Sequence, residues 1–313
     1  MHGMRAFAID DYGQIGTLRE LPAPEPAAGQ VLIRVTAAGV NPVDWKTRDG
    51  PGGSKPLPLI LGQDFAGVVE RGDGASEPRE GARVFGVART HGSYAEQTLV
   101  AAGSHGEPIA PIPDGVSDEQ AAALPTAGLT ALASLEILGV RQGSTVLILG
   151  ASGGVGGFAT QIAHHRGARV IGSARSDPER VRALGADEAL VGDDIAAQVK
   201  RNHPDGVDAV LDLVSDADAI EAFADVLRPG GGIVSTIHAA DEAWFAQRGF
   251  TATNVVVNRT AQSSPEGLSE LARMVVAGTL AVHVALEAPL ADAARVLERS
   301  KSGSLGGKAV LRP

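Results

Sequence analysis

The sequence predicts an α/β protein with two lobes, the first built mainly of antiparallel strands and the second around a doubly wound parallel sheet. Three observations lead to this prediction. The length of 313 residues is about twice the usual size of one domain. Short apolar runs separated by Gly and Pro fill the first third of the chain, which is typical of antiparallel β structure. From Thr145 onward, strand-length apolar runs alternate with helical periodicity, which predicts parallel strands joined by helical crossovers.

The β-rich lobe is expected from Met4 to about Glu107, with runs such as VLIRVTAAGV (31–40) and GARVFGV (81–87). Between residues 111 and 140, Ala and Leu recur at helical spacing. This change from short strand-like runs to helical spacing predicts one or two helices that lead into the second lobe.

The second lobe is expected to alternate strands and helices. Asp177 followed by Pro178 suits a helix start, and Gly167 and Gly185 suit helix ends. From about Arg259 we expect one or two further helices and a terminal strand, GGKAVLRP, that returns to the first lobe. The strands of the second lobe are predicted at 145–150, 168–173, 188–192, 206–214, 232–237 and 252–258, and its helices at 155–166, 178–185, 194–202 and 216–231.

A glycine-rich loop connects the first strand of this series to its helix. Bare backbone in such a loop lets a pyrophosphate approach the helix N-terminus, where free N–H groups and the helix dipole favour an anion. A plain strand-to-helix turn is the alternative, but the strand–loop–helix–strand context favours dinucleotide binding. Ala151 replaces the first Gly of the strict fingerprint and is small enough to permit the turn. The expected cofactor contacts here are Gly150, Ala151, Ser152, Gly153, Gly154, Val155 and Gly156.

The end of the next strand indicates which dinucleotide is bound. NAD-binding loops place an acid there for the ribose 2′-hydroxyl, but this sequence reads ARVIGSARS, with no acid before Asp177. Ser173, Ala174 and Arg175 are the expected contacts, since a hydroxyl and a guanidinium suit a 2′-phosphate. An ordinary solvated Arg175 is the alternative, and we predict NADPH as the cofactor.

Composition excludes several classes of protein. The net charge of −10 argues against nucleic acid or an anionic membrane as partner. The absence of Cys excludes disulfides, thiolate zinc sites and nucleophilic thiols. No signal-peptide pattern and no apolar run of membrane-spanning length is found, so a cytoplasmic enzyme is expected.

Several motifs resemble the medium-chain dehydrogenase/reductase superfamily, and within it the zinc-free quinone oxidoreductase (zeta-crystallin-like) branch. The resemblance implies a GroES-like β-barrel catalytic lobe at 1–123, completed by 259–313, and a Rossmann cofactor lobe at 124–258. The motifs are GVNPVDWKTRDG, PLILGQDFAGVV, GSYAEQ, LPTAGLTA, GASGGVG, LGADE, LRPGG and GGKAVL.

The resemblance also implies chemistry without a metal. Zinc alcohol dehydrogenases of the superfamily place a Cys ligand where Asn41 stands and a His ligand where Gln63 stands. Neither amide is a usual zinc ligand. Alcohol oxidation without a Lewis acid is disfavoured, whereas a quinone or an α,β-unsaturated carbonyl accepts hydride at carbon and spreads the charge onto oxygen.

The predicted catalytic residues are Asn41, Asp44 and Thr130. By resemblance Asn41 and Thr130 lie beside the nicotinamide, with an Asn-Pro turn and a packed helical Thr as alternatives. Asp44 either holds its loop, binds a ribose hydroxyl or is simply exposed, and Lys46 and Tyr94 are weaker candidates. Lys308 either approaches the cofactor or caps the sheet. Further cofactor contacts are expected from Asn41, Thr126, Thr130, Leu213, Val214, Ile237, His238 and Lys308.

The predicted function is NADPH-dependent reduction of a small-molecule quinone or enone. A pathway-specific enoyl or polyketide reductase and a crystallin-like NADPH-binding scaffold without turnover are the alternatives. A homodimer is expected through the strand ATNVVVN, because relatives often pair there and an uncovered apolar edge invites pairing.

Overall fold

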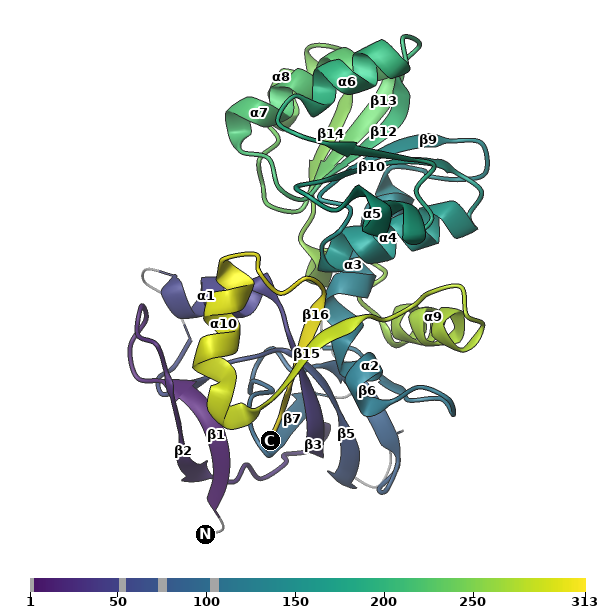
Figure 1. Cartoon of the computed structure of the whole chain (residues 1–313). Coiled ribbons are helices and arrows are strands. Elements are labelled where there is room, and N and C mark those ends of the chain that lie inside the picture. The colour runs from purple at the N-terminus through teal and green to yellow at the C-terminus, as the bar shows by residue number, and fades with distance from the viewer. Residues whose placement is uncertain (1–2, 51–54, 73–77, 102–106) are drawn as a thin grey trace. The chain divides into compact units, whose positions relative to one another are not determined.

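The computed structural model describes residues 3–50, 55–72, 78–101 and 107–313. These residues fall into two compact units, each of which is described by itself (Figure 1). The first unit contains the chain up to Leu129 together with Ala261–Gly278 and Val282–Pro313, and the second contains Thr130–Thr260 and Thr279–Ala281.

The described part of the first unit is built on two β-sheets. A three-stranded sheet has the order β2-β1-β4, and a seven-stranded sheet has the order β15-β16-β3-β5-β6-β8, with β7 also paired to β3. All pairs are antiparallel except β15 with β16. The strands are β1 (Gly3–Ile9), β2 (Thr17–Pro22), β3 (Gln30–Val40), β4 (Leu59–Ile60), β5 (Asp64–Arg71), β6 (Arg83–Val87), β7 (Gln97–Ala101), β8 (Ile109–Pro111), β15 (Val284–Pro289) and β16 (Lys308–Arg312).

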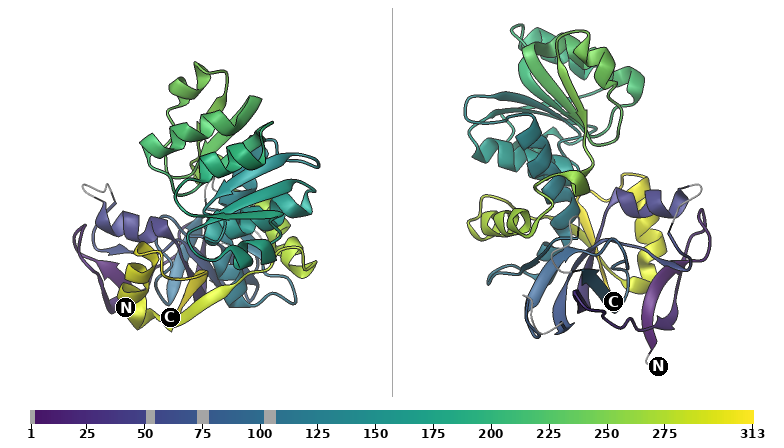
Figure 2. Two further views of the ribbon diagram at one scale, coloured as in Figure 1. Left: turned by 45° about the horizontal axis from the view of Figure 1, so that its top comes forward. Right: turned by 180° about the vertical axis from the view of Figure 1, so that it is seen from behind.

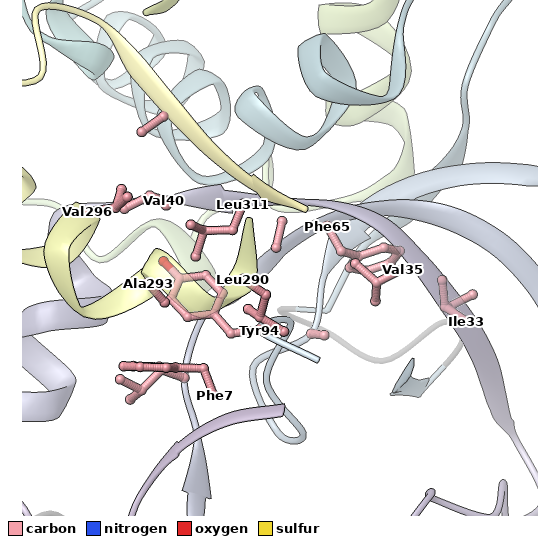
Figure 3. Close-up of a cluster of buried hydrophobic side chains, with 14 of the residues drawn as sticks. Phe7, Ile33, Val35, Val40, Phe65, Tyr94, Leu290, Ala293, Val296 and Leu311 are labelled. Atoms are coloured by element: carbon pink, nitrogen blue, oxygen red, sulfur yellow. The ribbon is translucent and has the colours of Figure 1, made fainter. Parts of the chain in front are cut away.

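Helices border these sheets, and the hydrophobic core of the unit lies beneath them. Helix α10 packs against α1. Side chains from β1, β3, β5, α10 and β16 meet in one buried cluster, which Figure 3 shows with Tyr94 among Phe7, Leu290 and Ala293. The helices are α1 (Pro42–Asp49), α2 (Asp118–Ala123), α9 (Pro265–Val276), α10 (Ala293–Lys301), the short η3 (Leu290–Asp292), and α3 (Pro125–Ile137), which continues into the second unit.

The terminal strand closes this unit, as predicted. Residues Ala309–Leu311 of β16 pair antiparallel with Ala38–Val40 at the end of β3. This pairing places Lys308, at the start of β16, beside the segment that leads into α1. Lys308 and Val40, which are 268 positions apart in the sequence, are thereby brought into contact.

The second unit is a doubly wound parallel sheet, which confirms the predicted fold class. The strand order is β11-β10-β9-β12-β13-β14, and every pair is parallel. Helices cover both faces, α4 and α5 on one and α6 to α8 on the other (Figures 1 and 2). The strands are β9 (Thr145–Leu149), β10 (Arg169–Ala174), β11 (Glu188–Val191), β12 (Val207–Asp212), β13 (Leu227–Ser235) and β14 (Thr251–Asn254). The helical segments are α4 (Gly154–His165), α5 (Pro178–Ala183), α6 (Ile195–Asn202), α7 (Ala217–Glu221), η1 (Ala222–Val226), α8 (Glu242–Ala246) and η2 (Val257–Arg259).

Local sequence signals account for several of these ends. Asp177 accepts a hydrogen bond from the Arg180 amide at 3.0 Å and caps α5, with Pro178 at its first position. Gly167 takes a φ of 76° just after α4, a conformation that glycine adopts without strain.

Two predicted elements differ from the structure. The helix predicted at 216–231 ends at Val226, and Leu227–Gly231 begin β13 instead. Pro229 disfavours helical backbone in the residue before it, and Gly230 has a φ of 80°. The strand predicted at 252–258 ends at Asn254, so its apolar part, 255–257, lies outside the edge strand β14. In the described part of the chain, no helix is long and apolar enough to cross a membrane.

Candidate active site

Asn41 lies at the centre of a buried polar cluster in the first unit. It precedes Pro42, the first residue of α1, and is 2% exposed. Lys308 Nζ donates to Asn41 Oδ1 at 2.5 Å and to the Val40 carbonyl at 3.1 Å. Asn41 Nδ2 donates to Asp64 Oδ2 at 2.7 Å. The Asn-Pro dipeptide thus begins a helix, and the Asn side chain connects two buried charged residues.

Asp64 connects this cluster to helix α3. It is the first residue of β5 and is fully buried. Besides the Asn41 amide, it accepts hydrogen bonds from the Thr126 backbone N–H at 3.0 Å and the Thr126 hydroxyl at 2.6 Å. Three donors therefore hold one carboxylate, which is what a buried acid requires.

Asp44 holds the other side of Asn41. Its Oδ2 accepts hydrogen bonds from the Asn41 backbone N–H and from the Tyr94 hydroxyl, both at 2.8 Å. Asp44 is 1% exposed, which rules out the alternative of an exposed loop residue. Tyr94 is fully buried within the core cluster (Figure 3), and its hydroxyl reaches the polar cluster from there.

Burial sets the charge state of these groups. Desolvation raises the pKa of Asp44 to about 7, against the hydrogen bonds from Asn41 and Tyr94, which lower it. Burial likewise raises the pKa of Asp64, and the nearby Lys308 opposes this change. Burial lowers the pKa of Lys308, whereas the charges of Asp64 and Asp44 raise it.

These contacts fix the orientation of the Asn41 amide. A lysine can only donate, so the group facing Lys308 is the carbonyl oxygen, and the group facing Asp64 is the NH2. An amide nitrogen carries two hydrogens, and the contact with Asp64 uses one. The second N–H makes no hydrogen bond among the described residues.

In the second unit, the glycine loop forms a bare cradle at the start of α4. Gly150 has a φ of 81°. A Cβ atom on Gly156 would lie 2.2 Å from the Gly150 carbonyl oxygen, so only glycine permits this approach. Gly153 is the N-cap and provides no side-chain hydrogen bond. The first amides of α4 are therefore available to an anion.

Ser173 and Arg175, predicted to contact a 2′-phosphate, differ in their surroundings. Ser173 is buried and accepts hydrogen bonds from the Gly150 amide through its Oγ at 3.2 Å and from the Ala151 amide through its carbonyl at 2.8 Å. Its first role is to hold the glycine loop. Arg175 is exposed and has no ion-pair partner among the residues that the structure describes.

The predicted site residues thus form two groups. Asn41, Asp44, Thr126 and Lys308 meet in the polar cluster of the first unit. Thr130, one turn after Thr126 on α3, is buried but belongs to the second unit. The glycine loop lies close to Ser173 and Val214 in the second unit.

Asp64 was not predicted as a site residue. The signal for it was a single carboxylate within the apolar run PLILGQDFAGVV, since an acid in a buried strand needs donors. Within the described ranges, no three His, Asp or Glu side chains form a group that could hold a metal ion.

Comparison with known families supports both halves of the predicted fold. Residues 27–122 match the alcohol dehydrogenase GroES-like domain. Residues 184–311 match the family described as zinc-binding dehydrogenase.

Two curated relatives are similar over most of this chain. The 2-methylene-furan-3-one reductase of Solanum lycopersicum is 35% identical over 248 residues, which is 74% of this chain and 61% of that protein. The quinone oxidoreductase of Rattus norvegicus is 36% identical over 224 residues, which is 68% of this chain and 67% of that protein. This chain therefore matches about three fifths to two thirds of the length of these relatives.

Solved structures are similar over the whole chain. The quinone oxidoreductase from Coxiella burnetii has a TM-score of 0.89 and 31% identity, with 100% of both chains covered. A mycobacterial protein complexed with NADPH has a TM-score of 0.85 and 28% identity, with 99% of this chain and 100% of that chain covered. With its GroES-like and Rossmann-like domains, the chain belongs to the zinc-independent quinone oxidoreductase branch of the medium-chain dehydrogenase/reductase superfamily.

Proposed function

We propose that this oxidoreductase uses NADPH to reduce a quinone or an α,β-unsaturated carbonyl without a metal ion. Relatives named quinone oxidoreductase and 2-methylene-furan-3-one reductase support this class of acceptor. The observation that carries the proposal is the fixed amide of Asn41, held by Lys308 on its oxygen and by Asp64 on its nitrogen. We also propose that residues 1–123 and 259–313 form the catalytic domain and that residues 124–258 bind the cofactor.

The second unit has the features that a nicotinamide dinucleotide requires. The helix start without a capping side chain offers backbone amides to a pyrophosphate, and the missing Cβ atoms at Gly150 and Gly156 leave the backbone accessible. A mycobacterial structure of the same fold is complexed with NADPH. These features fit the cofactor class, and they would serve NADH and NADPH equally.

Arg175 is the group that would favour NADPH. It follows β10, where NAD-binding members of this fold place an acid for the ribose 2′-hydroxyl. Its guanidinium is exposed and unpaired among the described residues, so a 2′-phosphate would meet no competing carboxylate there. Ser173, which is held by the glycine loop, would contribute through its remaining O–H.

A bound reduced nicotinamide supplies a hydride. Residues of the chain must then stabilise the negative charge that develops on a carbonyl oxygen of the acceptor. The free N–H of Asn41 is suited to this task, because Lys308 and Asp64 have already fixed its direction and no reorganisation is needed during the reaction. The buried amine of Lys308 polarises the Asn41 carbonyl and so strengthens the N–H as a donor.

The direct test is cofactor oxidation in the presence of possible acceptors. NADPH consumption is followed by the loss of its ultraviolet absorbance, with a panel of quinones, enones and an enoyl thioester. We expect turnover with quinones or enones and much less with simple ketones. Binding of NADPH with no turnover on any acceptor would favour the scaffold alternative. Turnover limited to the thioester would favour a pathway-specific reductase.

We also propose a homodimer joined through β14. This strand is the edge of the six-stranded sheet and has one unpaired side. It reads Thr-Ala-Thr-Asn, so pairing would rest on backbone hydrogen bonds more than on apolar contact. Light scattering at micromolar concentration should give twice the 31.9 kDa chain mass, and a monomer mass would contradict the proposal.

A further inference from the structure

The carboxyl ends of strands β12 and β13 are joined by a hydrogen bond between two buried side chains. Asp212 and Ser235 are the last residues of these strands and lie opposite each other in the parallel register. Both are 0% exposed. Ser235 Oγ donates to Asp212 Oδ2 at 2.9 Å. The polar cluster of the first unit contains neither residue.

The second oxygen of Asp212 holds the loop after β12. Asp212 Oδ1 accepts hydrogen bonds from the backbone amides of Val214 at 3.2 Å and Ser215 at 2.9 Å. The same loop lies against the glycine cradle, because a Cβ atom on Gly150 would come within 2.8 Å of Val214 Cγ1. Asp212 therefore fixes a loop that packs against Gly150, at the start of the glycine loop.

Ser235 holds the loop after β13 in a strained conformation. Its Oγ accepts hydrogen bonds from the amides of Ile237 at 3.4 Å and Ala239 at 3.2 Å. Between them lies His238, the one residue other than glycine with positive φ, 62°, in the described chain. This backbone is strained for a residue with a Cβ atom and persists only where surrounding contacts impose it.

The far end of the same loop is also held. The Ala240 amide donates to Asn254 Oδ1 at 3.2 Å, and Asn254 Nδ2 donates to the Ala240 carbonyl at 2.8 Å. The Thr236 amide donates to the Asp212 carbonyl at 3.1 Å. These contacts hold both ends of the loop, and His238 between them is exposed.

The loop after β12 lies where a doubly wound sheet binds its ligand, and the loop after β13 lies at the next strand of the same edge. The strand order runs from β9 to β10 and β11 in one direction and to β12, β13 and β14 in the other. Ligands of such sheets bind at the carboxyl ends of the strands, at the point where this order reverses. Here that point lies between β9, which leads into the glycine loop, and β12, which ends at Asp212.

We propose that Asp212 and Ser235 are positioning residues for the dinucleotide, because they hold segments 213–215 and 236–240 in the conformation that receives it. This inference rests on the proposed function and extends it to two residues that act through the backbone. The Ser235 hydroxyl matters most, since it contacts both the Asp212 carboxylate and two amides of the strained turn at His238.

The test is dinucleotide affinity in the Ser235→Ala variant, measured by titration with NADPH and with NADH. We expect both affinities to fall by the same factor, about tenfold. The two dinucleotides differ only in the 2′-phosphate, and the proposed role of these loops does not involve that group. The Ser134→Ala variant is the matched control, because Ser134 is a fully buried serine of the same unit whose Oγ has no hydrogen-bond partner in the described structure. It should bind both dinucleotides like the wild type.

A second substitution separates positioning from stability. If Ser235 acts by holding His238 at positive φ, Ser235→Ala should weaken binding much less in a His238→Gly background than in the wild-type background, because glycine adopts this backbone without strain. The His238→Gly single variant measures any contact that the His238 side chain itself makes with the dinucleotide. If Ser235→Ala does not fold, Asp212→Asn replaces it. The amide oxygen can still accept from Val214 and Ser215, whereas the NH2 group cannot accept the hydrogen bond that Ser235 Oγ now donates to Asp212 Oδ2. Wild-type affinity in Ser235→Ala, or an equal loss of affinity in the wild-type and His238→Gly backgrounds, would overturn the inference. A wild-type chain that bound neither dinucleotide would refute the proposed function itself, and this inference with it.

Discussion

The buried carboxyl group of Asp44 should make the stability of this protein depend on pH. Its pKa is raised from 3.8 to about 7 because the carboxyl group is fully buried. The protonated form is thus favoured in the folded state. The stability that this group contributes is fully present below pH 3.8 and is lost as the pH rises toward 7. At about 1.36 kcal/mol per pKa unit, a shift of about three units corresponds to a loss of about 4 kcal/mol.

The Asp44→Asn variant should remove this pH dependence and keep the fold. An amide oxygen can still accept from the Asn41 N–H and the Tyr94 hydroxyl, the two donors that now contact Asp44 Oδ2. The new NH2 group replaces Oδ1, which has no hydrogen-bond partner in the described structure. We expect the variant to gain stability relative to wild type by about 2–3 kcal/mol between pH 5 and pH 7.

The assay is urea unfolding of both proteins at several pH values between 5 and 8. Only the difference between the two free energies of unfolding is compared, because other groups titrate equally in both. Asp49→Asn, in the same helix, is the control. The hydrogen bond from Arg48 lowers the pKa of Asp49 to about 2, so this difference should stay constant above pH 5. Parallel curves for Asp44→Asn and wild type would refute the reasoning, because they would mean that Asp44 stays ionised when buried.

Three further predictions concern the reaction. Asn41→Ala should lower kcat by about tenfold to a thousandfold with little change in NADPH affinity, since it removes one donor to the developing oxyanion; unchanged kcat with weaker cofactor binding would make Asn41 a cofactor contact instead. Arg175→Ala should weaken NADPH binding by about tenfold to a hundredfold and leave NADH binding unchanged, as titration calorimetry can show. Dialysis against a strong chelator should leave the turnover rate unchanged, and activity that is lost and then restored by zinc would mean that the ligand positions at Asn41 and Gln63 were misassigned.

The parts of the fold with a local cause could be predicted from the sequence. The β9–α4 turn, the cap at Asp177 and the alternation of strands and helices each depend on residues within about one turn of each other. The helix predicted at 216–231 was wrong at its end for a local reason as well, because Pro229 and Gly230 disfavour helical backbone there although the apolar spacing of a helix continues.

The candidate site was predicted less completely, because its contacts join distant parts of the chain. The sequence could mark Asn41, Asp44, Thr126 and Lys308 as candidates through family resemblance. It could not show that Lys308 donates to Asn41, because that contact depends on the pairing of β16 with β3. Ser173 illustrates the same limit, since its hydroxyl was expected to face a 2′-phosphate and is found bonded to the Gly150 amide.

Buried carboxylates have the same role in both units, and this explains why so many of them are tolerated. Asp64 accepts three hydrogen bonds in the first unit, and Asp212 accepts three in the second. Burying such a group costs several kcal/mol unless donors surround it, and each of these donors belongs to a segment expected to contact a ligand. Asp64 orients the Asn41 amide and Thr126, and Asp212 orients the loop of Val214 and the Ser235 hydroxyl. Each acid therefore fixes neutral donors in place before a ligand binds, so replacing either one should weaken binding or catalysis more than its distance from the ligand would suggest.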